Sequence, residues 1–189
     1  MGRLRTARIS LVVSVLLAMG TTTAASQSVD GPPATSAVLE RLYGTYRYAG
    51  DPAAAHATIQ KSIEAAVSSL GWLGRKVAAS RLANHKELPD RIEIKRKGDD
   101  VSVKMGQYSA IAPIDGTERE LVGPNGRDSK LSYRLANDEL QQFFVFEHAK
   151  RKSTYRYNEL GQLVMSVSMT SEKLASPIEY ELVYAKAAP

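Results

Sequence analysis

Residues 91–105 read RIEIKRKGDDVSVKM, and this stretch decides the fold class. Apolar side chains occupy alternate positions on both sides of a Gly-Asp-Asp turn, at Ile92, Ile94, Val101, Val103 and Met105. A period of two residues places alternate side chains on opposite faces of a β-strand, and a short glycine-containing turn joins antiparallel neighbours. The stretch therefore predicts a β-hairpin with one apolar face and one polar face.

The same period continues towards the C-terminus. Apolar residues alternate with polar ones in 131–135, 163–169 and 178–184. With a first strand at 42–48, the chain has about ten strands joined by short turns, which favours antiparallel neighbours. A sheet of this length curls, and closure removes its unpaired edges. We predict a mainly β protein, an antiparallel up-and-down β-barrel of about ten strands. A half-buried open sheet with two helices on one face is the alternative.

Residues 51–88 predict a helical insert after the first strand. Asp51 is a good N-cap, and Pro52 suits the first helical position because its missing N–H has no partner to lose there. Apolar residues then follow a helical period, at Ile59, Ile63, Ala66, Val67 and Leu70. A second, shorter helix is expected at 75–84.

Residues 1–26 carry the features of a secretory signal peptide. Three arginines precede an uncharged apolar run over 9–19, and small residues follow it. The run is much shorter than the roughly 20 apolar residues of a spanning helix, so we expect cleavage. The chain has no cysteine, which excludes a lipid anchor. We predict a periplasmic or secreted protein with a flexible leader at 27–38 and a lipocalin-like barrel domain at 39–189.

Charge and motifs exclude several functional classes. The formal net charge is +5, but the signal peptide supplies most of the excess, so the mature domain has no bulk electrostatic reason to bind nucleic acid. Without cysteine there is no disulfide, thiolate metal site or thiol chemistry. His56, His85 and His148 lie in separate segments, and no HExxH, GxSxG or Walker A motif is present. We assign no catalytic residue, metal ligand or cofactor site, and we expect a non-enzymatic monomer.

The order of elements resembles the calycin superfamily, the lipocalins and fatty-acid-binding proteins. The segment LYGTYR at 42–47 is similar to the Gly-x-Trp strand that opens calycin barrels, with Tyr46 in place of Trp. A helix pair after the first strand, followed by an unbroken meander, is similar to the fatty-acid-binding branch. The last strand has Ile178-Glu179-Tyr180 where many of those proteins carry an Arg-x-Tyr carboxylate anchor. The resemblance implies a barrel that encloses an apolar ligand.

The apolar strand faces are the candidate lining of such a barrel. Tyrosine combines a flat apolar body with one hydroxyl, which suits a cavity that orients an amphipathic guest. The predicted ligand-binding residues are Tyr46, Ile94, Val103, Tyr133, Phe144, Tyr155, Met165 and Tyr180. We predict an exported, non-catalytic binding protein for a small hydrophobic or amphipathic, lipid-like ligand. The alternative is a filled-core β-barrel acting as an envelope protein–protein interaction or inhibitor module.

Two basic segments have alternative interpretations. Trp72, Arg75 and Lys76 combine an aromatic ring with cations, a pattern typical of transient contact with a membrane surface. The alternative is that Trp72 packs the insert onto the barrel while the cations are solvated. For the run Lys150-Arg151-Lys152, we expect a solvated hairpin turn.

Overall fold

The computed structural model describes residues 34–72, 88–122 and 128–188. The predicted signal peptide, the first part of the expected leader and the expected helix at 75–84 lie outside the described residues. Arg75, Lys76 and His85 lie outside them as well.

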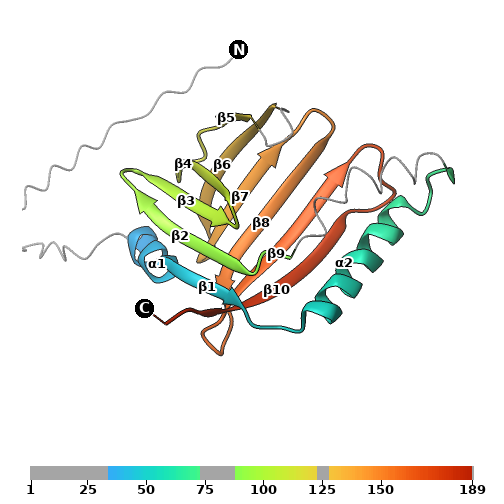
Figure 1. The fold of residues 1–189 in the computed structure, drawn as a ribbon. Helices are drawn as coiled ribbons and strands as arrows, with labels where there is room; N and C mark the ends of the chain where they lie inside the picture. Colours follow the sequence, from blue (N-terminus) through green and yellow to red (C-terminus); the bar gives the residue numbers. More distant parts are fainter. Residues whose placement is uncertain (1–33, 73–87, 123–127, 189) are drawn as a thin grey trace, which may run out of the picture. The chain divides into compact units, whose positions relative to one another are not determined.

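Ten strands form one sheet in which every hydrogen-bonded pair is antiparallel, so the predicted fold class is confirmed (Figure 1). The strand order across the sheet is β4-β3-β2-β1-β10-β9-β8-β7-β6-β5. The strands are β1 (Gly44–Tyr48), β2 (Arg91–Lys97), β3 (Asp100–Met105), β4 (Tyr108–Pro113), β5 (Arg119–Val122), β6 (Asp128–Ala136), β7 (Glu139–Val145), β8 (Ala149–Tyr157), β9 (Leu163–Ser171) and β10 (Ile178–Lys186).

The register places the predicted apolar faces on one side of the sheet. Ile94 lies opposite Val103, and Met165 lies between Tyr155 and Leu182 on its neighbouring strands. These side chains belong to one buried core cluster. The other side carries mainly lysine, arginine, glutamate and serine. The strand period therefore defines an inner, apolar face and an outer, polar face.

The sheet closes almost completely where β4 meets β6. The Tyr133 hydroxyl donates a hydrogen bond of 2.9 Å to the Ala110 carbonyl, which connects the inner face of β6 with β4. Beyond β4, Asp115 forms an isolated antiparallel bridge with Arg134 of β6. The structure is therefore a nearly closed barrel, and the open-sheet alternative is wrong.

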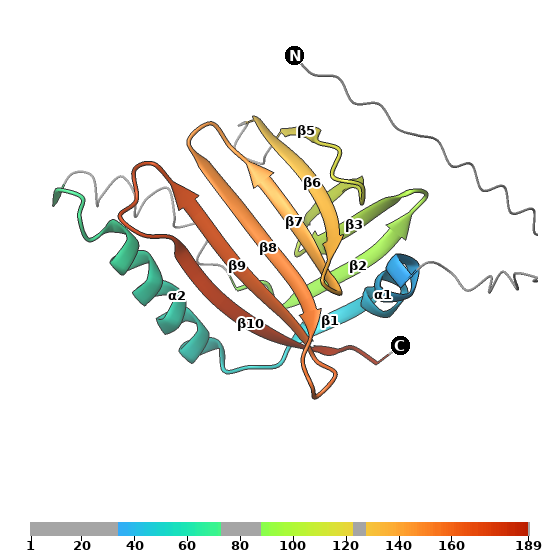
Figure 2. The same ribbon diagram turned by 180° about the vertical axis from the view of Figure 1, so that it is seen from behind.

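Helix α2 (Pro52–Val67) covers an edge of β10 that β1 leaves free (Figures 1 and 2). The pairing with β1 extends only over residues 184–186 of β10. Further along β10, the Glu179 amide donates to Ser62 Oγ at 2.8 Å, and the Ala175 amide just before the strand donates to the Ala66 carbonyl. The helix begins as predicted, because the Asp51 carboxylate accepts a hydrogen bond from the Ala53 amide.

A helix that the sequence analysis missed, α1 (Ala34–Leu42), precedes β1. Residues 34–38 belong to it rather than to a flexible leader, and the first strand starts at Gly44 rather than at residue 42. Leu39 and Leu42 are buried in the core. Two tyrosine hydroxyls stabilise its last turn. Tyr46 donates a hydrogen bond to the Leu42 carbonyl, and Tyr157 donates one to the Arg41 carbonyl. In the part of the chain that the structure describes, no helix has the length and apolar character to cross a membrane.

The packing of α2 makes a first prediction about stability. Ile63 is 4% exposed, and its replacement in Ile63→Ala leaves a cavity between the helix and the barrel. We expect the free energy of unfolding in urea to fall by about 2–5 kcal/mol. Lys61→Ala, on the exposed side of the same helix, is the control and should change it by less than about 0.5 kcal/mol. Equal effects of the two substitutions would contradict the packing of α2 described above.

Candidate functional site

All eight predicted lining residues lie on the inner face of the barrel. Phe144 and Tyr180 are partly exposed. The other six are at most 1% exposed, namely Tyr46, Ile94, Val103, Tyr133, Tyr155 and Met165. Their contact with a ligand stays a prediction. The burial shows that these six belong to the packed interior, whereas Phe144 and Tyr180 lie where the inner face is accessible.

A chain of hydrogen bonds crosses the interior. The Tyr155 hydroxyl donates to Gln142 Oε1 at 3.0 Å, and Gln142 Nε2 donates to the Tyr133 hydroxyl at 2.7 Å. Tyr133 in turn donates to the Ala110 carbonyl. Gln142 is fully buried and was not among the predicted residues. The sequence feature that could have pointed to Gln142 was a single amide side chain at an inward position of β7, a strand that is apolar on both faces near Phe143.

The interior tyrosines are held neutral. Burial raises the pKa of the Tyr155 phenol to about 12, although the nearby Arg151 guanidinium lowers it. Burial also raises the phenol pKa of Tyr46, Tyr133 and Tyr184 well above 10. Near neutral pH these hydroxyls are therefore hydrogen-bond donors and acceptors rather than phenolate anions.

Three buried polar atoms have no hydrogen-bond partner among the residues that the structure describes: Arg151 Nε, Ser153 Oγ and Tyr184 Oη. The expectation of a solvated turn at 150–152 is wrong, because these residues belong to β8 and the turn lies just before them. Arg151 points to the inner face, directly opposite Phe144 on β7. Its positive charge acts on the Tyr155 and Tyr184 phenols, which places all three groups in the same part of the interior.

The inner face offers this arginine no carboxylate. None of the described strand positions on the inner face is Asp or Glu. Within the same described ranges, Arg151 forms no ion pair. A buried guanidinium N–H without an acceptor is costly, and the positive charge attracts anions. The inner face therefore offers an anionic group the Arg151 guanidinium, with the Ser153 hydroxyl two residues further along the same strand.

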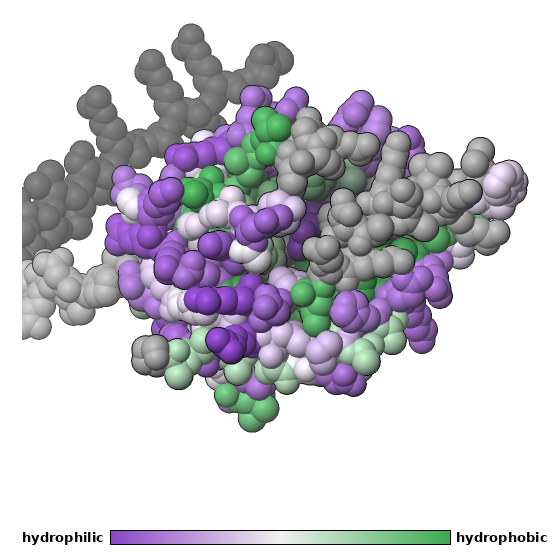
Figure 3. Space-filling view, viewed as in Figure 1, coloured by the Kyte–Doolittle hydropathy of each residue, from purple (hydrophilic) through white to green (hydrophobic). Residues whose placement is uncertain are grey.

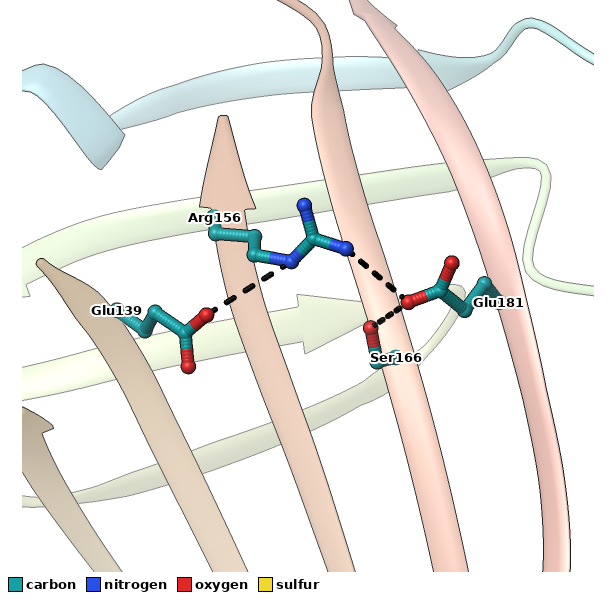
Figure 4. A network of polar contacts seen from close by, with 4 residues as sticks. All are labelled: Glu139, Arg156, Ser166 and Glu181. Atoms are coloured by element: carbon teal, nitrogen blue, oxygen red, sulfur yellow. Dashed lines mark hydrogen bonds and ion pairs between the residues drawn. The ribbon is translucent and has the colours of Figure 1, made fainter. Parts of the chain in front are cut away.

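A separate surface cavity of about 260 Å³ lies at the other end of β8, where Arg156 and Tyr157 end the strand. It lies between α1 and the β6–β7 turn and is lined by Val38, Arg41, Leu42, Asn137, Asp138, Glu139, Arg156 and Tyr157. Its Arg156 is bound on both sides, by Glu139 at 3.7 Å and Glu181 at 3.2 Å, with Ser166 hydrogen-bonded to the same Glu181 oxygen (Figure 4). Arg156 is therefore engaged by two carboxylates, unlike Arg151 in the interior.

Of the remaining candidate residues from the sequence, the structure describes Trp72, His56 and His148. Trp72 is 73% exposed, so it does not pack the insert onto the barrel, and its contact with a membrane stays a prediction. His56 Nδ1 lies 2.7 Å from the Pro52 carbonyl, and His148 lies beside Glu147. In the described ranges, no three His, Cys, Asp or Glu side chains come together as a metal site would require.

The comparisons with known proteins support the fold of the chain. No family model matches the chain, and no curated protein matches its sequence. Among solved structures, an abundant heat soluble (SAHS) protein from Ramazzottius varieornatus has a TM-score of 0.51 at 12% identity, covering 78% of this chain and 96% of that one. Lipid binding protein 8 from Caenorhabditis elegans has a TM-score of 0.49 at 15% identity, with 78% and 96% covered. Zebrafish ileal bile acid-binding protein, complexed with cholic acid, has 0.48 at 14%, with 78% and 99% covered.

The similarity of the Ramazzottius protein and the strand order together define a calycin-like β-barrel. The fold that the sequence resemblance implied is therefore confirmed.

The unpartnered hydroxyl of Tyr184 makes a second prediction. Tyr184→Phe removes a buried group that has no described partner, so we expect the free energy of unfolding to rise by about 1 kcal/mol. Tyr133→Phe removes the same atom from a residue that both donates and accepts, and should cost about 1–3 kcal/mol. Urea unfolding of both variants gives the comparison. A similar loss in both would show that Tyr184 Oη is not an unsatisfied group.

Proposed function

We propose that the protein is a non-catalytic binding protein for a small amphipathic molecule with an apolar body and an anionic head group, held inside the barrel. One observation carries this function: Arg151 Nε, Ser153 Oγ and Tyr184 Oη are buried without described partners, and the described strand positions of the interior hold no carboxylate. We propose further that the protein is exported, since residues 1–26 have the pattern of a cleavable signal peptide.

The energetics favour an anionic head group. A buried donor without an acceptor costs about 1–3 kcal/mol, and more if it is charged. A carboxylate or another oxyanion accepts hydrogen bonds from a guanidinium and from neutral hydroxyls, and charge-assisted bonds are about twice as strong as neutral ones. Binding such a group removes the cost of the unpaired donors. A neutral apolar molecule leaves that cost in place.

The body of the ligand has an apolar contact surface beside this group. Phe144 lies opposite Arg151 across the β7–β8 pair, and Tyr180 lies on the same inner face. Both are partly exposed, so a guest can reach them without first displacing the fully buried core. Each methylene that leaves water contributes about 0.8 kcal/mol. Affinity then comes from the apolar body and selectivity from the charged end.

The filled-core barrel that acts through its surface is the second candidate. The observation in its favour is the complete burial of Tyr46, Tyr133, Tyr155 and Tyr184, whose rings occupy interior volume that a large ligand would need. The two candidates differ in what they predict for the accessible part of the inner face.

Phe144 and its neighbour Phe143 provide a matched test, because they point to opposite faces of β7. We expect Phe144→Ala to weaken the binding of dodecanoate by about tenfold, the loss for one apolar contact of about 1–2 kcal/mol. Phe143→Ala should leave the affinity within about twofold. Isothermal titration calorimetry gives both values. A wild-type protein that binds neither dodecanoate nor dodecanol would support the filled-core candidate instead.

The head-group assignment is tested with two ligands of one chain length. We expect the wild type to bind dodecanoate at least about tenfold tighter than dodecanol, since the anion gains charge-assisted hydrogen bonds. Arg151→Met should remove this preference while dodecanol binding persists. The control is Lys150→Met, which loses the same charge from the exposed outer face one residue away. An undiminished preference in a folded Arg151→Met protein would exclude Arg151 as the anchor.

A further inference from the structure

We propose that the outer face of β1–β3 docks the protein on an anionic lipid surface. Five exposed cations form this basic face: Arg47, Arg91, Lys95, Lys97 and Lys104. They lie on three hydrogen-bonded strands, on the side opposite to the apolar interior. The inference goes beyond the proposed function, because it concerns the outer wall and does not require a guest in the barrel.

The register of β1 and β2 places two of these cations against each other. Arg47 lies directly opposite Arg91 in the antiparallel pair. Like charges in this position destabilise a sheet, because the side chains of directly opposed residues are close neighbours. The pair thus has no stabilising role within the barrel, and an external anion relieves its repulsion.

Glu93 is the one acid at the centre of the basic face, and it is already engaged. Its carboxylate lies 2.7 Å from Lys95 Nζ and directly opposite Lys104 on β3. The hydrogen bond from Lys95, together with the charges of Arg91 and Lys104, holds the pKa of Glu93 below its usual value. One carboxylate does not neutralise five cations, so the centre of the face keeps a positive potential.

Other acids border the basic face without cancelling it. Asp90 precedes β2 and Asp99 lies in the β2–β3 turn, so both stand at the ends of the strands. Asp100 is bound to Arg119 at 2.9 Å. On the outer face of β10, Glu181 is paired with Arg156 at 3.2 Å and Glu179 accepts a hydrogen bond from Ser168. Exposed cations therefore outnumber the acids over β1–β3, which gives this part of the wall a charge that attracts an anionic surface.

The distribution of the cations favours a lipid surface over a nucleic acid. They spread over about 10 Å across three strands and about 20 Å along β2, which covers an area rather than following a line. Figure 3 shows the hydrophilic residues over β2 and β3 as a broad surface. No aromatic side chain stands among the described outward positions of β1–β3, whereas proteins that bind single strands stack bases on such rings. Lysine and arginine near an anionic bilayer each add to binding.

The test is co-sedimentation with vesicles of phosphatidylcholine alone and of phosphatidylcholine mixed with phosphatidylglycerol. We expect the protein to sediment with the anionic vesicles only, and less as salt is raised. The double substitution Arg47→Gln, Arg91→Gln should weaken this binding about 25-fold, at about fivefold for each cation. The matched control is Lys150→Gln, Lys152→Gln, which removes the same charge from the outer face of β8 and should change binding by less than about threefold.

Three results would overturn the proposal. They are equal sedimentation with both kinds of vesicle, equal losses in the two double variants, and tighter binding to a DNA duplex than to anionic vesicles at the same salt concentration. The last result, if it is sensitive to Arg47 and Arg91, would assign the basic face to a nucleic acid. None of these results affects the preference for dodecanoate over dodecanol, so the proposal for the basic face and the proposal for the interior site are tested separately.

Discussion

The junction between β4 and β6 is the constraint on which the barrel depends. Every other neighbouring pair in the sheet shares a ladder of backbone hydrogen bonds, whereas here the Tyr133 hydroxyl reaches across to the Ala110 carbonyl. Gln142 and Tyr155 extend the contact over two more strands and hold the phenol in place. Because these bonds are shielded from water, each is electrostatically stronger than at the surface. If this junction opened, the apolar face of all ten strands would meet solvent.

The polar atoms of the interior fall into two groups, paired and unpaired. Tyr133, Gln142 and Tyr155 satisfy one another, which favours a single arrangement of the closed wall. Arg151 and Tyr184 lie in the same apolar surroundings and keep unpaired donors within the described structure. Folding alone gives no reason to keep a buried guanidinium N–H without an acceptor, since an apolar residue of similar size avoids the cost of desolvation. A local departure from the rule that buried polar groups are paired is typical of functional sites.

The sequence was most informative where one face of a strand is apolar and the other is polar. The alternation in 91–105 predicted β2, β3 and the orientation of Ile94 and Val103. It was least informative over β7 and β8, because Phe143 and Phe144 make β7 apolar on both faces and the charged run around Arg151 resembles a turn. Helix α1 escaped detection because its nine residues give only about two and a half helical turns. Its last turn is held by the nearby Tyr46 and by Tyr157, which lies 116 residues away in the sequence. The contact with Tyr157 follows from the closed fold and has no local pattern.

Because β1 has only five residues, β10 is held less firmly along its β1 edge than along its β9 edge. Where β10 adjoins β9, a continuous ladder of seven residue pairs protects its amides. Its other edge meets β1 only at 184–186, and beyond that it relies on helix packing and single hydrogen bonds such as that from Glu179 to Ser62. Detaching α2 therefore breaks few backbone bonds, while separating β10 from β9 breaks many. We therefore expect the β10 amides that face α2 to form a local unit of lower opening free energy in hydrogen exchange, so that this side of the barrel opens before the rest unfolds.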